Sequence, residues 1–203
     1  MILRITEKFI KKEAKKVGIP VYICMPSSFR RILKKREKNL LKKFDKRRKN
    51  LNGLYVHYWT RGKSDPSRSY IYVSKKNSLG KGKNKKMTNS RILGHLYHEI
   101  GHHECKKKNC QCLRNPEKPQ KTLSEDHAHN YVLNICLKRK IVPVLIDYMK
   151  YLNFNAQNGD KVAFRIIKKD IWKKCEKFLR KVGCGFLFFR PIFLSGKKGL
   201  RVR

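Results

Sequence analysis

Arg91-Ile-Leu-Gly-His-Leu-Tyr-His-Glu-Ile-Gly-His-His103 is the stretch that decides the fold, because it contains the pattern His98-Glu99-x-x-His102. On a helix, with about 100° per residue, the two histidines lie one turn apart and about 40° from each other. Two imidazole nitrogens can therefore converge on one zinc ion. Glu99 is displaced by about 100° from His98, so it lies beside the ion and can take a proton from a bound water. The spacing predicts a zinc hydrolase site.

The residues around this motif predict a helix with one apolar side. Roughly opposite the two histidines lie Leu93, Leu96, Tyr97 and Ile100. The apolar side can therefore face a core while the ligands face a cleft. Gly101 removes a side chain next to the ligands, which permits close approach of a neighbouring strand or substrate. The alternative is a surface helix that happens to carry His and Glu.

A second amphipathic helix, from about Thr122 to the residue before Pro143, offers the third ligand. Its predicted buried face consists of Ala128, Tyr131, Val132, Ile135 and Cys136. Glu125 falls on the same face, and a carboxylate buried there without a partner would cost several kcal/mol. A metal ion supplies that partner, so we predict Glu125 as the third zinc ligand. Thr122-x-x-Glu125 is also a capping box, in which Glu125 would only satisfy a backbone N–H.

Two further histidines and a tyrosine lie on the predicted metal side or close to it. His129 follows Glu125 by one turn and about 40°, so it could order that carboxylate or stabilise an oxyanion. His95 precedes His98 by one turn on the metal side. Tyr131 is a third candidate for such a supporting contact. An ordinary hydrogen-bonded role explains either histidine as well.

Aromatic and β-branched runs before the motif predict strands. Residues 54–59 and 69–73 flank a turn-rich segment and predict an antiparallel hairpin. Upstream, residues 2–17 and a segment from Ser27 or Ser28 to about residue 50 predict basic amphipathic helices around a short strand at 21–24. We therefore expect an α+β fold with helices packed on a small, mostly antiparallel sheet. Zinc would lie between the motif helix and the helix that carries Glu125.

One predicted strand has a possible role in substrate binding. Tyr70, Ile71, Tyr72 and Val73 form the run that comes just before the motif helix. This strand is placed to pair with an extended substrate, which would add to the sheet as one more β-strand.

Positive charge dominates the composition. The chain has 52 Lys and Arg against 14 Asp and Glu, a formal net charge of +38. Such a surface attracts the phosphates of nucleic acids and acidic proteins. Lysines that merely solvate the surface would explain the same composition. The longest apolar run near the end, residues 184–194, is interrupted and too short to span a bilayer.

The cysteines raise the question of a second metal site. Cys105, Cys110 and Cys112 have the spacing Cys-x4-Cys-x-Cys, which is not a usual zinc arrangement, so we expect free thiols. No secretory segment opens the chain, which favours a cytoplasmic protein with reduced cysteines.

Together these motifs resemble the ImmA/IrrE-like zinc metallopeptidases, a gluzincin-type family that includes enzymes cleaving phage-type repressors. The likeness covers about residues 50–140 and rests on the strand 70–73, His98-Glu-Ile-Gly-His102 and Glu125-x-x-Ala128-x-x-Tyr131-Val132. It implies zinc on His98, His102 and Glu125, with Glu99 as the catalytic base. The family commonly has Asn after the alanine, where this chain has His129.

The chain divides at about residue 140. Residues 1–140 form the expected metallopeptidase domain, with a helix–strand–helix unit over 1–50 and the hairpin and active-site helices over 51–140. Residues 141–203 form a C-terminal extension, with helices expected at 144–152 and 161–182 and strand material at 186–189 and 192–194. This extension could be a wing-like nucleic-acid module, or it could complete the core.

We therefore expect a zinc-dependent endopeptidase that acts on a protein or peptide substrate. The charge favours a DNA-associated regulatory protein, such as a repressor, as that substrate. The alternative is a basic nucleic-acid-binding protein whose metal is structural and which has no protease activity.

Overall fold

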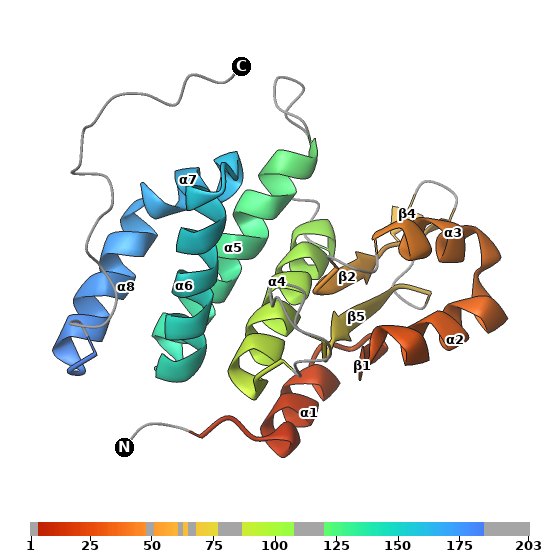
Figure 1. The fold of residues 1–203 in the computed structure, drawn as a ribbon, viewed down its shortest axis with the longest axis horizontal. Coiled ribbons are helices and arrows are strands. Elements are labelled where there is room, and N and C mark those ends of the chain that lie inside the picture. Colours follow the sequence, from red (N-terminus) through yellow and green to blue (C-terminus); the bar gives the residue numbers. More distant parts are fainter. Residues whose placement is uncertain are drawn as a thin grey trace.

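The computed structural model describes residues 4–47, 51–60, 63–64, 68–76, 87–107 and 120–184. Within these ranges, a small sheet packs against one side of helix α4 (Asn89–Lys107), and further helices pack against its other side (Figure 1). The predicted α+β class is confirmed at this level. None of the described helices combines the length and the apolar composition that crossing a bilayer requires.

The N-terminal part contains α1 (Glu7–Lys15), β1 (Val21–Cys24), α2 (Pro26–Arg36) and α3 (Lys38–Arg47). The single long helix expected up to about residue 50 is wrong, because the chain bends at Glu37. On a straight helix, Phe29 and Phe44 would lie about 22 Å apart along the axis. The bend returns α3 to α2, and the two rings meet with centroids 5.2 Å apart in one apolar cluster.

The sheet has the strand order β1-β5-β2. The predicted antiparallel pairing is confirmed for β2 (Gly53–Val56) with β5 (Tyr70–Ser74), whereas β1 and β5 run parallel, so the sheet is mixed rather than mostly antiparallel. A separate two-stranded ribbon, β3 (Trp59–Thr60) and β4 (Lys63–Ser64), lies in the connection between β2 and β5.

The position of β5 corrects one prediction about substrate binding. β5 lies between β1 and β2, and all five of its residues are buried. Its backbone already pairs on both sides, so Tyr70, Ile71, Tyr72 and Val73 cannot accept a substrate strand. The edges of the described sheet are β1 and β2.

Helices α4 and α5 (Gln120–Lys138) pack at very short range. A Cβ placed on Gly101 of α4 would lie 2.7 Å from Cα of Ala128 on α5. Gly101 thus permits the approach of a helix, and not of the strand or substrate that the sequence suggested. This close packing carries Glu125 towards the histidines of α4.

The described part of the C-terminal region consists of α6 (Val142–Gln157), α7 (Lys161–Ile167) and α8 (Asp170–Lys181). The single helix expected over 161–182 is wrong, since Lys169 takes an extended backbone (φ −81°, ψ 156°) between α7 and α8. Apolar residues of all three helices, such as Leu145, Ile166 and Leu179, belong to the core that also contains Leu96 of α4. The strand material expected at 186–189 and 192–194 lies outside the described residues.

Candidate metal centre

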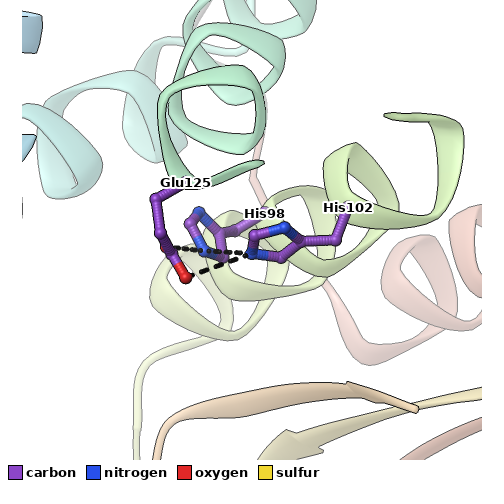
Figure 2. A group of neighbouring side chains, drawn as sticks. All are labelled: His98, His102 and Glu125. Carbon is purple, nitrogen blue, oxygen red and sulfur yellow. Dashed lines mark hydrogen bonds and ion pairs between the residues drawn. The ribbon is translucent and has the colours of Figure 1, made fainter. Parts of the chain in front are cut away.

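His98, His102 and Glu125 come together between α4 and α5, and we call them the ligand group (Figure 2). The two Nε2 atoms are 3.1 Å apart, and the Glu125 oxygens lie 3.2 Å from His98 Nε2 and 3.6 Å from His102 Nε2. Ligand atoms at about 2.1 Å from a tetrahedral ion would be separated by about 3.4 Å. The distances fit this arrangement, so the group could hold a metal ion.

Each imidazole of the ligand group is held at its other ring nitrogen. His98 Nδ1 lies 2.8 Å from the hydroxyl of Tyr148, and His102 Nδ1 lies 2.7 Å from the hydroxyl of Ser124. Hydrogen bonds of this kind fix the ring orientation and tautomer of a metal-binding histidine. Both Nε2 atoms are thereby directed to the same point.

Tyr148 reaches His98 because α4 carries a glycine where α6 approaches it. A Cβ on Gly94 would lie 3.2 Å from Cδ2 of Tyr148. This contact could not be predicted from the sequence, since Tyr148 is one aromatic residue on the apolar face of a predicted helix. Ser124 was likewise missed, although it adjoins Glu125 in the chain.

The electrostatics of the ligand group favour a cation. Burial opposes ionisation of Glu125, but the hydrogen bond with His98 and the charges of both ligand histidines lower its pKa to about 2. Burial lowers the pKa of His102 to about 4. The group therefore offers an ionised carboxylate at Glu125 and a neutral imidazole at His102 at neutral pH, which are the forms that bind metals. Burial opposes protonation of His98, but the hydrogen bond with Glu125 and the charges of Glu99 and Glu125 raise its pKa, so a metal ion would displace a proton from His98.

Glu99 is buried beside the ligand group. Burial raises its pKa to about 7, the charge of His98 opposes this rise, and the Tyr55 backbone N–H donates a hydrogen bond that also lowers it. A carboxyl group with a pKa near the working pH can both accept and return a proton. Glu99 thus lines the same cleft as the ligand group and carries a raised pKa.

His129 shares a hydrogen-bond partner with His98 of the ligand group. Its Nδ1 lies 2.7 Å from the same Tyr148 hydroxyl that contacts His98, and its ring centroid is 4.6 Å from that of His98. His129 is buried and is not among the residues that line the cleft described below. His129 therefore has the ordinary hydrogen-bonded role that the sequence also allowed, with Tyr148 as its partner, and a contact with an oxyanion stays a prediction.

His95 and Tyr131, the other two candidates for a supporting contact, differ in their position relative to the cleft. His95 lies in the same cleft as the ligand group, where its ring packs edge-on against Tyr151, and burial lowers its pKa to about 3. Tyr131 does not line that cleft, because its side chain packs against Gly101. A supporting role for Tyr131 therefore stays a prediction.

An open cleft of about 420 Å³ contains the ligand group. One wall is α4, and the opposite wall is the edge strand β2 with the residues on either side of it. On β2, the Tyr55 hydroxyl lies 2.8 Å from His57 Nδ1 and 3.2 Å from His103 Nδ1. Tyr55 and His57 were not predicted as site residues, because the substrate was expected on the strand 70–73.

The predicted cysteine cluster is only partly covered by the structure. Cys105 is fully buried, and Cys110 and Cys112 lie outside the described residues. The thiols of Cys24, Cys136, Cys175 and Cys184 form no disulfide in the described part of the chain.

Comparisons of the chain with protein-family models, curated protein sequences and solved structures gave no match. Function is therefore inferred from the site itself and from the resemblance of its motifs.

Proposed function

We propose that this protein is a zinc-dependent endopeptidase. The observation that carries the proposal is the ligand group of two imidazoles and one carboxylate, with Glu99 beside it in an open cleft. Imidazole and carboxylate donors suit zinc. Catalytic zinc sites have three protein ligands and leave one position for water or substrate, whereas structural sites are closed by four ligands. The resemblance to the ImmA/IrrE-like metallopeptidases supports the same assignment.

Zinc held by His98, His102 and Glu125 would lower the pKa of a water and polarise a peptide carbonyl. Glu99 removes the proton from the attacking water and delivers it to the leaving amine. Tyr148 and Ser124 keep the two imidazoles in the orientation that the ligand group requires.

The edge strand β2 replaces β5 as the strand that would bind substrate. It forms a wall of the cleft, and an extended peptide can add to the edge of a sheet through main-chain hydrogen bonds. A peptide bound there would pass directly over the ligand group and Glu99.

Replacing Glu99 by Gln tests the proposal. The zinc-loaded variant should bind the metal as the original protein does and should lose cleavage of a mixed peptide library by more than about a hundredfold. Proteolysis retained by Glu99→Gln would refute the role of Glu99.

A second candidate function rests on the net charge of +38. In that case the protein binds nucleic acid and its metal only stabilises the fold. This function predicts strongly salt-dependent binding of duplex DNA, which Glu99→Gln would leave unchanged, and no cleavage of any peptide. The charge is also consistent with a protease whose substrate is a DNA-associated regulatory protein.

A further inference from the structure

The two ends of the cleft differ in chemistry. α4 lines the cleft with His95, His98, His102 and Lys106, which are spaced by about one helical turn. At the His95 end, the imidazole packs edge-on against Tyr151, with ring centroids 5.2 Å apart. This end is aromatic, with Glu99 one helical turn from His95; burial lowers the pKa of His95, and the charges of His98 and Arg91 lower it further.

The other end of the cleft carries positive charge. Lys106 is half-buried there and lines the cleft together with His57. Burial lowers the pKa of His57, and the charge of Lys106 lowers it further. Within the described part of the chain, Lys106 forms no ion pair.

The carboxylates of the cleft are engaged elsewhere. Glu125 contacts the two ligand histidines, and Glu99 accepts a hydrogen bond from the Tyr55 backbone. An acidic group that neutralises Lys106 in the cleft would therefore have to come from outside the described residues, and a bound peptide can supply one. Pairing would be stronger there than on the open surface, because Lys106 is partly withdrawn from water.

The distance from the ligand group sets the position of such an acidic residue. Lys106 follows His102 by four residues, which is about 6 Å along a helix. An extended peptide advances by about 3.3 Å per residue, so 6 Å corresponds to about two residues. A peptide lying along β2 would thus bring a side chain close to Lys106 about two residues from the bond that is cut.

We infer that Lys106 forms a subsite for an acidic side chain of the substrate, about two residues from the scissile bond. This inference rests on the proposed peptidase function and names the class of peptide that it would prefer. Asp or Glu would accept a charge-assisted hydrogen bond from the Lys106 ammonium.

The experiment compares charge-reversal variants of two adjacent lysines. Lys107 follows Lys106, is exposed and does not line the cleft, so Lys107→Glu is a matched control for Lys106→Glu. Both changes place an acidic residue in the last turn of α4, where it interacts unfavourably with the helix dipole to a similar extent. Lys106→Gln removes the charge without reversing it. It replaces Lys106→Glu in the experiment if Lys106→Glu does not fold.

The zinc-loaded full-length proteins are incubated with a randomised decapeptide library, and the cut sites are read by mass spectrometry. The original protein and Lys107→Glu should prefer Asp or Glu about two residues from the cut, with a kcat/KM about tenfold above that for Ala there. Lys106→Gln should lose this preference, and Lys106→Glu should favour Lys or Arg instead.

The outcomes separate the inference from the proposed function. Cleavage by the original protein with no acidic preference, or an acidic preference that persists in Lys106→Gln and Lys106→Glu, overturns the subsite but leaves the peptidase in place. Absence of cleavage by every zinc-loaded protein overturns both.

Discussion

Gly53 of β2 lies directly against Glu99 of α4. A side chain at residue 53 would overlap the Glu99 carboxylate and would come within 2.9 Å of its Cγ. The strand also binds Glu99 through the Tyr55 backbone N–H. The edge strand that would carry the substrate therefore also fixes the position of the proposed base.

Gly53→Ala should reduce catalysis without removing the metal. The added methyl group must displace Glu99, and a misplacement of about 1 Å in a catalytic group can lower kcat by about a hundredfold. Zinc affinity should remain unchanged, because the atoms nearest to a side chain at residue 53 belong to Glu99 and not to the ligand group. Steady-state kinetics and zinc titration of the same preparation measure the two effects, and a kcat equal to that of the original protein would show that Gly53 does not position Glu99.

Tyr148→Phe should weaken metal binding. The change removes the hydroxyl that lies 2.8 Å from His98 Nδ1 and 2.7 Å from His129 Nδ1, while it keeps the ring in the core. Loss of a hydrogen bond behind a metal ligand typically lowers metal affinity by about 10- to 100-fold. Tyr151→Phe is the control, since Tyr151 packs on His95 and not on a ligand histidine. Equal zinc affinities of the two variants in a chelator competition would contradict this role of Tyr148.

Glu13→Gln should destabilise the fold. Glu13 is buried, and its carboxylate receives hydrogen bonds from Lys16 at 2.6 Å and Tyr97 at 3.0 Å and pairs with Arg139. It thus connects α1 with α4 and with Arg139, the residue that follows α5. We expect the free energy of unfolding to fall by about 1–3 kcal/mol at pH 7, as measured by urea denaturation.

The same carboxylate predicts a dependence of stability on pH. Burial would raise the pKa of Glu13, but the hydrogen bonds from Lys16 and Tyr97 and the charge of Arg139 lower it below its usual value. Because the unfolded chain, with a pKa of about 4.3, takes up the proton first, the contribution is present above about pH 4.3. It is lost as the pH falls through the lower pKa of the folded state. The stability difference between the original protein and Glu13→Gln should therefore shrink towards pH 3, and a constant difference would contradict this assignment.

The sequence predicted the parts of the site that depend on local spacing. His98 and His102 are one turn apart on one helix, so helix geometry alone brings them together. Glu125 was predicted because a carboxylate on an apolar helix face needs a partner, and the structure places it within 3.6 Å of both histidines. These three residues could therefore be predicted without knowing the topology of the fold.

The parts that failed depend on contacts between distant segments. The order of strands in the sheet is not encoded in any one strand, so the sequence could not tell that β5 is central and that β2 faces the cleft. Tyr148 is 50 residues from His98, and only the close packing of α6 on Gly94 reveals its role. The break at Glu37 likewise follows from the packing of Phe29 on Phe44, which a helical repeat alone does not show.

Metal binding by Glu125→Gln tests the central claim most directly, with Asp126→Asn as the control because Asp126 pairs with Arg165 and Lys169 instead. Zinc titration should give one ion per chain for the original protein and for Asp126→Asn. Since loss of an outer hydrogen bond already costs up to about a hundredfold in affinity, Glu125→Gln should lose more than that. If Glu125→Gln bound one ion with undiminished affinity, the assignment of Glu125 as a metal ligand would be contradicted.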